Sequence, residues 1–337
     1  MSATFGERLR VTVFGQSHSE AMGAVVDGLP AGLRIDTEHL RAFLARRAPG
    51  QGPLTTARRE PDAPEIVAGL ADGVTCGAPL CILIRNTDAR SRDYETLRRV
   101  VRPSHADYPA YVRFGGHNDI RGGGQFSGRL TAPLCAAGAV ALQCLAARGV
   151  GVYAHIASIA GIKDAAVDPV SPDLPALAAL AAKPLPVLDA RAGEAMAQAV
   201  RDAAADGDSV GGVVECVVTG LPAGVGEPLY DSVESRLAAL LFAVPAVKGV
   251  EFGAGFAAAA LRGSENNDGY TASGGEVRTL SNHSGGICGG LTTGMPVVFR
   301  AAFKPTPSIA RPQRTVALPG PEETTLTVGG RHDPCVV

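Results

Sequence analysis

The chain has 337 residues, 46% of them hydrophobic and 19% charged, with 42 glycines and 24 prolines. This length and composition predict a soluble globular protein of one or two domains with many turns. The net charge of −2 argues against a nucleic-acid partner, which would require a basic face. The longest apolar run, 132–147, is interrupted by Gln143 and is predicted to be too short to cross a membrane.

The cysteines and the first residues bear on metal binding and on location in the cell. The seven cysteines form no CxxC pair and have no histidines at zinc spacing, so we expect no metal site. The opening stretch MSATFGERLR contains no apolar run, so we expect no signal peptide. Together these observations predict a cytoplasmic protein with reduced thiols.

The first predicted elements are strands and turns around one capped helix. Residues 10–15 alternate and predict a strand, which is followed by the turn GQSHSE. Residues 23–32 predict a second strand that ends in a turn. Asp36 is placed to cap a helix that stops at Pro49, and residues 79–84 predict a short buried strand.

The later elements include a long helix and a polar excursion. Residues 131–148 are rich in alanine and predict a central helix. Strands are predicted at 210–220 and 295–303, and a helix at 232–242. Residues 163–205 are rich in Ala, Pro and Asp and poor in large apolar residues, which predicts a surface excursion within a single domain.

One short stretch occurs twice in the chain. VVDGLPAG begins at Val25, and VVTGLPAG begins at Val217. Chance similarity between two strand–turn segments explains this as well as a duplication does. Two related halves would give a pseudo-symmetric core.

The stretch RGGGQFSGRLT, residues 121–131, is the strongest local signal for a ligand site. It is not a P-loop, because Arg129 and Leu130 stand where Lys and Ser/Thr are needed. It is not a dinucleotide fingerprint, because Ser127 replaces the last glycine. It is either a glycine-rich turn or an anion site, where bare backbone, a helix start and Arg129 contact a phosphate.

Two histidines strengthen the second interpretation. His18 follows a strand in GQSHSE, and His105 lies near Arg102 in VRPSHADY. Histidines in loops beside serines and arginines favour proton transfer or anion contact. Other polar clusters are Arg46-Arg47, Arg58-Arg59, Lys304 with Thr306 and Ser308, and Arg331 with His332 and Asp333. Together, the glycine-rich stretch, the histidines and these polar clusters predict a pocket for a small ligand that carries phosphate and carboxylate groups.

The chain resembles the chorismate synthases over essentially its whole length. The matching motifs, in chain order, are GQSHSEAMGAVVDGLP, RREPD, RPSHADY, GGGQFSGRLT, VPAVKGVEFG, SNHSGGICGG, KPTPS and GRHDPC. The resemblance implies an α+β fold, a sandwich of central helices between antiparallel β-sheets, in one catalytic domain over residues 1–337. It also implies a homotetramer.

The resemblance further implies a lyase of the shikimate pathway of aromatic amino acid biosynthesis. The family removes phosphate from 5-enolpyruvylshikimate 3-phosphate by 1,4-anti elimination and gives chorismate. It requires reduced FMN although the reaction has no net redox change. NADPH is then an indirect reductant, and neither a membrane nor a nucleic acid is a partner.

The family's functional residues can be assigned to matching positions of this chain. His18 matches the histidine that protonates the departing phosphate, and His105 the one that stabilises the anionic reduced flavin. Asp333 matches the aspartate that helps flavin N5 accept the C6 proton. Substrate binding is implied for Arg47, Arg102, Ser127, Arg129 and Arg331. Flavin contact is implied for Arg47, Gln125, Phe126, Ser127, Pro245, Ala246, Gly289, Lys304, Pro305, Thr306, Pro307, Ser308 and Arg331.

The chain also departs from the family pattern. The unusual residues are Gln16 for Glu, Ser19 for Gly, Gln125-Phe126 for Arg-Ser, Leu130 for Glu, and Pro53 for an NADP-linked Arg. Gln125 and Leu130 are candidates for a compensating pair, since together they remove one charge of each sign. The chain ends at Val337, where the family continues into a helical segment. These departures leave two alternatives open, a flavin-dependent reductase and a flavin-binding protein with altered or lost activity.

Overall fold

The computed structural model describes residues 3–50, 52, 54–55, 60–87, 99–329 and 332–337. The chain divides into two compact units. The first unit comprises residues 1–144, 203–209 and 306–334, and the second comprises 145–202, 210–305 and 335–337. That the whole chain acts as one catalytic domain remains a prediction.

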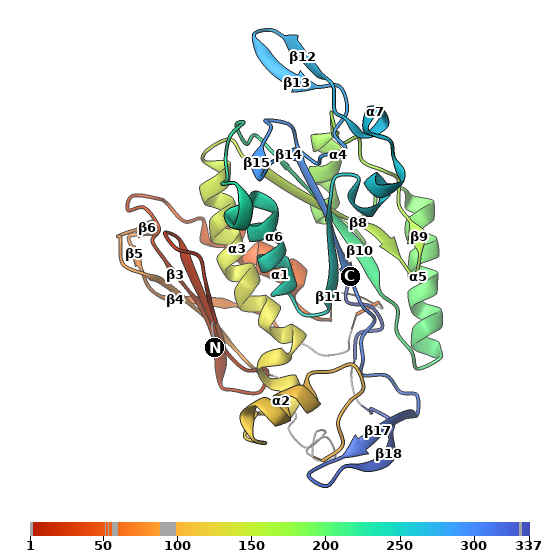
Figure 1. Ribbon diagram of the computed structural model, residues 1–337. Helices are drawn as coiled ribbons and strands as arrows, with labels where there is room; N and C mark the ends of the chain where they lie inside the picture. The colour runs from red at the N-terminus through yellow and green to blue at the C-terminus, as the bar shows by residue number, and fades with distance from the viewer. Residues whose placement is uncertain (1–2, 51, 53, 56–59, 88–98, 330–331) are drawn as a thin grey trace. The chain divides into compact units, whose positions relative to one another are not determined.

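The first unit is built on a five-stranded antiparallel sheet (Figure 1). Its strand order is β1-β2-β3-β7-β4. The strands are β1 (Thr4–Phe5), β2 (Arg10–Gly15), β3 (Ala21–Asp27), β7 (Leu80–Arg85) and β4 (Pro64–Ala68). A short hairpin of β5 (Leu70–Ala71) and β6 (Val74–Thr75) joins β4 to β7. The strands predicted at 10–15, 23–32 and 79–84 are therefore confirmed.

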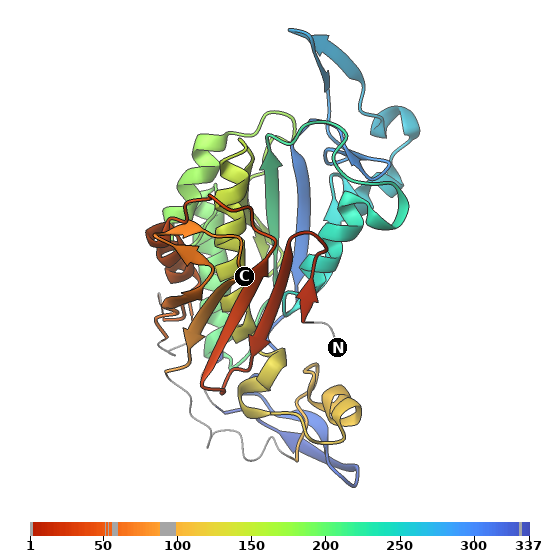
Figure 2. The same ribbon diagram turned by 90° about the vertical axis from the view of Figure 1, so that its left-hand side faces the viewer.

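Helices cover one face of this sheet. α1 (Thr37–Arg47) begins at Asp36, whose side chain accepts the His39 N–H at 2.9 Å, as predicted. α3 (Thr131–Ala146) lies behind the strands in Figure 2 and packs its small side chains against them. The shared core includes Met22, Leu40, Leu80 and Ala136. The unit also holds α2 (Asp107–Phe114), the 3₁₀ turns η3 (Arg121–Phe126) and η4 (Gly128–Leu130), and the hairpin β17 (Gln313–Ala317)–β18 (Glu322–Leu326).

The helical stretch Gly128–Ala146 is, by length and composition alone, able to cross a membrane. This stretch includes the 3₁₀ turn η4 and is longer than the apolar run at 132–147, to which the prediction applied. Its side chains at Ala132, Ala136, Ala139 and Val140 are fully buried in the core of the first unit. A helix that is apolar on all sides is expected in such a core.

The second unit contains another five-stranded antiparallel sheet. Its order is β11-β16-β10-β8-β9. The strands are β11 (Val247–Phe252), β16 (Val297–Phe303), β10 (Gly212–Thr219), β8 (Gly151–Ile159) and β9 (Ile162–Lys163). Every strand pair among the described residues is antiparallel, and helices are present in both units, so the predicted α+β class is confirmed.

Charged side chains form a ladder across this second sheet. His155, Glu215, Arg300 and Glu251 are successive cross-strand neighbours on β8, β10, β16 and β11. The His155 ring is buried between Asp164, 3.0 Å from Nδ1, and Glu215, 3.1 Å from Nε2. Burial alone would lower the pKa of His155, but the hydrogen bonds to the two carboxylates outweigh it and raise the pKa.

The predicted surface excursion at 163–205 is wrong. It contains α4 (Leu174–Ala179), η5 (Leu180–Ala182) and α5 (Ala190–Ala205). Leu177, Leu180, Met196 and Val200 are buried at helical spacing, and a few large side chains among many alanines are enough to anchor these helices. The second unit is completed by η6 (Leu229–Asp231), α6 (Val233–Phe242), η7 (Gly255–Ala260), α7 (Gly263–Asn266) and the hairpin β14 (Ile287–Cys288)–β15 (Leu291–Thr292). The hairpin β12 (Tyr270–Ser273)–β13 (Glu276–Thr279) projects from the rest of the unit (Figure 1).

The repeated sequence occupies equivalent places in the two units. β3 and β10 are each the central strand of their sheet, and each is followed by the LPAG turn. Thr75 Oγ1 donates to Pro30 O at 2.6 Å and accepts Leu33 N–H, and Thr292 Oγ1 donates to Pro222 O at 2.6 Å and accepts Val225 N–H. Matching side-chain bonds from matching hairpins favour two related halves over chance similarity.

Candidate active site

The three glycines of the central loop each lie against a specific neighbour. Gly122, Gly123 and Gly124 have positive φ angles of 58°, 85° and 55°, which L-residues rarely adopt. A side-chain carbon on Gly122 would collide with the His18 ring, and one on Gly123 would lie 3.1 Å from His105 Nε2. One on Gly124 would collide with the Asp119 carbonyl oxygen. The loop therefore needs bare backbone because it packs against both histidine rings.

His18 is buried and held by its neighbour Ser17. Ser17 Oγ donates to the Arg121 carbonyl at 2.8 Å and lies 3.1 Å from His18 Nδ1. A hydroxyl has one proton, so this geometry assigns the Nδ1 proton to His18. The ring also lies near Asp119, whose pKa is lowered chiefly by its hydrogen bond from Arg121 and further by His18.

His105 and Arg102 share a buried carboxylate. Asp107, the first residue of α2, accepts from Arg102 Nε at 2.7 Å and Nη2 at 2.8 Å, and its Oδ1 lies 2.7 Å from His105 Nδ1. Burial alone would raise the pKa of Asp107, but the bonds from Arg102 and His105 outweigh it and hold the pKa well below its usual range. His332 lies near Arg102 and His105: burial lowers the pKa of His332 most, and Arg102 and His105 lower it further.

A second buried cluster holds Arg47 and Arg129. Asp62 is fully buried and pairs through Oδ2 with Arg47 Nη1 and through Oδ1 with Arg129 Nη1. Glu60 Oε2 lies 3.6 Å from Arg129 Nη2. Burial lowers the pKa of the Arg129 guanidinium, and Asp62 opposes this, so the side chain stays charged. Ser127 caps the turn that carries Arg129, because its hydroxyl accepts the Arg129 N–H at 3.2 Å.

Three of the departures from the family pattern line one cavity. Gln16, Gln125 and Phe126 share a cavity of about 230 Å³ with Phe114, His117, Asn118 and Asp119. The rings of Phe114 and Phe126 lie 6.4 Å apart. Leu130 is buried and does not line this cavity, so Gln16 is a better match than Leu130 for a change that accompanies Gln125.

The remaining predicted flavin residues belong to both units. In the first, Ser308 is buried and Thr306 Oγ1 is a buried oxygen without a hydrogen-bond partner among the described residues. In the second, Ala246 has a left-handed φ of 73° and accepts the Lys304 N–H at 2.9 Å. Burial lowers the pKa of Lys304 most, and Lys248 lowers it further. Among the other predicted residues, Pro245 and Gly289 lie in loops, and Asp333 is half-buried. The structure also describes Pro305 and Pro307. Arg331 lies outside the described residues, as do Pro53, Arg58 and Arg59.

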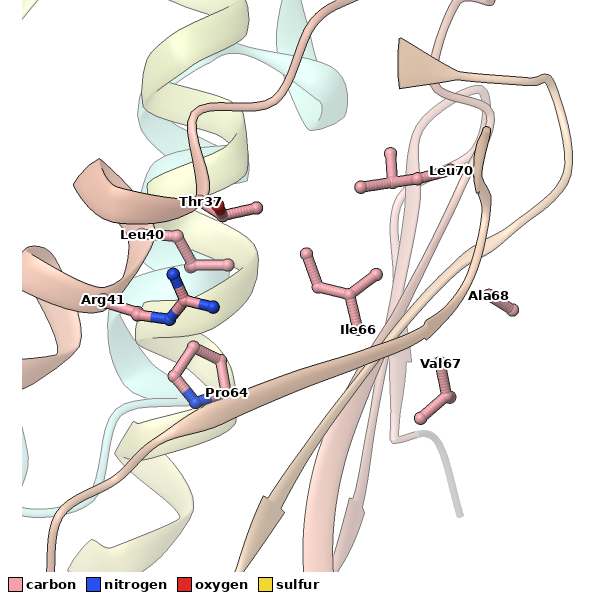
Figure 3. Close-up of a pocket in the computed structure, with 8 residues that line it drawn as sticks. All are labelled: Thr37, Leu40, Arg41, Pro64, Ile66, Val67, Ala68 and Leu70. Carbon is pink, nitrogen blue, oxygen red and sulfur yellow. The ribbon is translucent and has the colours of Figure 1, made fainter. Parts of the chain in front are cut away.

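A larger cavity lies away from all of these residues. It has a volume of about 300 Å³ and is lined by α1, β4 and Leu70 in the first unit. Figure 3 shows Leu40 and Ile66 facing each other across it, with Arg41 at one side. Its lining carries one charged side chain and none of the predicted catalytic residues, so size alone does not mark the site.

The structure thus brings together several side chains that the sequence only suggested. His18 and His105 contact one loop, Arg102 joins His105, and Arg47 joins Arg129. Sequence reasoning missed Asp62 and Asp107, which hold these cations. Both lie within recognised motifs, RREPD and RPSHADY, but an acid beside arginines in a sequence is usually solvated.

Comparison with known proteins agrees with this arrangement. A family model described as chorismate synthase matches residues 9–337. The chain is 47% identical to the chorismate synthase of Methanocella arvoryzae, over 99% of this chain and 88% of that protein. It is 48% identical to that of Aeropyrum pernix, over 99% and 87%. A crystal structure of chorismate synthase matches with a TM-score of 0.74 and 28% identity, over 90% of this chain and 85% of the other.

Proposed function

Because the chain belongs to the chorismate synthase family, we propose that it eliminates phosphate from 5-enolpyruvylshikimate 3-phosphate and gives chorismate. The reaction is a 1,4-anti elimination, and the enzyme is a carbon–oxygen lyase. The observation that carries the proposal is the placement of His18 and His105 against one glycine loop, with Arg102 beside His105. A substrate with one phosphate and two carboxylates requires such cationic and proton-donating groups.

The roles of the individual residues follow from this proposal. His18 protonates the departing phosphate, and Ser17 fixes the orientation of its ring at Nδ1. Arg47, Arg102, Arg129 and Ser127 bind the anionic groups of the substrate. His105 stabilises the cofactor, and its Nδ1 is held by Asp107. By family resemblance, Arg331 also binds an anionic group, and Asp333 acts beside the cofactor.

Reduced FMN is the proposed cofactor, with NADPH as its indirect reductant. Thr306 in the first unit fits the phosphate end of such a group, because its Oγ1 is a buried oxygen without a partner among the described residues. The C6 hydrogen is not acidic, and an aspartate such as Asp333 is too weak a base for it. When bound, reduced flavin would supply the electron density for departure of phosphate and an acceptor for this hydrogen, while the protein's own residues would orient the substrate and solvate its charges.

A homotetramer in the cytoplasm is proposed for the assembled enzyme. The second unit exposes several large apolar side chains, among them Leu229 at 80%, Tyr230 at 91% and Phe256 at 86%. Exposed apolar groups of this size favour burial in a subunit interface. Light scattering should then give a mass four times that of the 34.4 kDa chain.

An anaerobic assay tests the reaction itself. The enzyme is given a small amount of reduced FMN, and phosphate and chorismate are followed together. We expect equal amounts of both products and many turnovers per flavin. Consumption of one reduced flavin per phosphate would indicate a reductase instead. Binding of FMN and substrate without phosphate release would indicate a flavin-binding protein with lost activity.

A further inference from the structure

The two arginines Arg47 and Arg129 do not lie free in the first unit but share one carboxylate. We propose that Asp62 is a positioning residue, which fixes the two guanidinium groups in the geometry that binds the anionic groups of the substrate. This inference rests on the proposed function, since it assumes that Arg47 and Arg129 contact the substrate.

The hydrogen bonds around Asp62 fix both guanidinium planes. One carboxylate oxygen pairs with Arg47 and the other with Arg129, so both are used. Arg47 Nε also donates to Thr131 Oγ1 at 3.1 Å, and Arg129 Nε donates to Asn86 Oδ1 at 3.3 Å. A planar group that is held at two points cannot rotate, so its remaining N–H groups point in fixed directions.

One of those remaining groups has no acceptor among the described residues. Arg129 is 4% exposed, and its Nη2 is buried without a hydrogen-bond partner in this part of the chain. Glu60 Oε2 lies 3.6 Å from Nη2, beyond hydrogen-bond distance, and instead accepts from Thr87. A buried charged donor is unfavourable unless an acceptor reaches it. An oxygen of the bound substrate would be that acceptor.

The charge of this cluster distinguishes two roles that Asp62 could have: positioning the two arginines, or only reducing their positive charge. Among the described residues, two arginines face two carboxylates, Asp62 and Glu60, so the charges of these four side chains balance. If Asp62 only reduced the positive charge, its removal would make the cluster cationic and tighten anion binding. If Asp62 positions the arginines, its removal weakens binding because the two guanidinium groups repel each other and move. The two roles therefore predict changes of opposite sign.

The test is substrate affinity of Asp62→Asn, measured by calorimetry with saturating oxidised FMN so that no turnover occurs. Asn suits the left-handed φ of 47° at this position, so the backbone is retained. We expect the dissociation constant of 5-enolpyruvylshikimate 3-phosphate to rise about 10- to 100-fold, the scale of one charge-assisted contact. In turnover, KM should rise more than kcat falls.

Two further variants complete the experiment. Asp62→Glu keeps the charge and displaces the carboxylate, so it should also weaken binding, by about tenfold. Asp27→Asn is the matched control, because Asp27 pairs with Arg10 on an exposed part of the same unit, and it should bind substrate like the original protein.

Each other result has a defined meaning. Unchanged or tighter binding by Asp62→Asn overturns the positioning role, and so does unchanged binding by Asp62→Glu. If circular dichroism shows that neither variant folds, Asp62 is structural and the inference is also overturned. If the unmodified protein binds no substrate, the proposed function fails instead.

Discussion

At the level of single residues, neighbours determine what each histidine can do. Ser17 holds Nδ1 of His18, and Asp107 holds Nδ1 of His105. Each ring is therefore fixed in orientation through its Nδ1. A histidine that is oriented in this way can donate or accept a proton without first rotating.

Replacement of either histidine should therefore affect turnover far more than folding. His18→Ala and His105→Ala should each lower kcat by about 10²- to 10⁴-fold, the usual contribution of a positioned acid or base. His39→Ala is the control, since His39 is exposed on α1, and it should retain full activity. Near-normal turnover in a folded His18→Ala protein would remove His18 from the proposed mechanism.

Gln125 tests how the altered loop affects the cofactor. It is exposed and lines the cavity that contains Gln16 and Phe126. Gln125 is one of the residues proposed to contact the flavin. Gln125→Arg should therefore change the dissociation constant of FMN, measured by fluorescence titration, more than it changes kcat. A large change in kcat at unchanged FMN affinity would instead assign Gln125 to the reaction.

At the level of local elements, two glycines of the central loop, Gly122 and Gly128, form a matched pair for substitution by alanine. Gly122→Ala should destabilise the protein by about 1–3 kcal/mol through its left-handed φ, and should displace the His18 ring and lower kcat. A side-chain carbon on Gly128 would have no other atom within 4 Å, so Gly128→Ala should change stability by less than about 0.5 kcal/mol. Urea unfolding and steady-state kinetics of both variants check this. Equal effects would mean that contact with His18 is unimportant.

The ladder in the second sheet makes stability depend on pH. The pKa of His155 is raised in the folded state, so its stabilisation is complete below its unfolded pKa of about 6.5 and is lost as pH rises through the folded value. Each unit by which the pKa is raised corresponds to about 1.4 kcal/mol. Urea unfolding should therefore show that the unmodified protein loses more stability between pH 6 and pH 9 than His155→Gln does. The same loss in both proteins would contradict this role of His155.

At the scale of the whole molecule, the sequence predicted regular elements better than it predicted long-range contacts. Capping by Asp36 and the alternation in β2 are local, so both were visible in the sequence. The helices within 163–205 were missed because alanine carries no strong periodic signal. The duplication was one of two open alternatives until matching bonds at Thr75 and Thr292 favoured it.

The candidate site was predictable to the extent that its residues lie in recognisable motifs. The histidines and arginines could be named from GQSHSE, RPSHADY and GGGQFSGRLT. Their partners could not, because Asp62 and Arg129 are separated by 67 residues in sequence. Whether an acid is solvated or is buried between two cations depends on the tertiary fold.

The pairing of every described arginine of the proposed substrate site with a buried carboxylate also bears on how the substrate would arrive. Arg47 and Arg129 share Asp62, and Arg102 pairs with Asp107, so the positive charge of these three described arginines is offset at short range. Electrostatic steering, which accelerates association by about 10- to 10³-fold in other enzymes, should then be weak. Because added salt screens only a field that reaches solvent, stopped-flow association of substrate should change by less than about twofold between roughly 50 and 300 mM salt. A steep fall in the association rate over this range would contradict that expectation. The enzyme would thus recognise its highly anionic substrate by contact at short range and not by attraction at a distance.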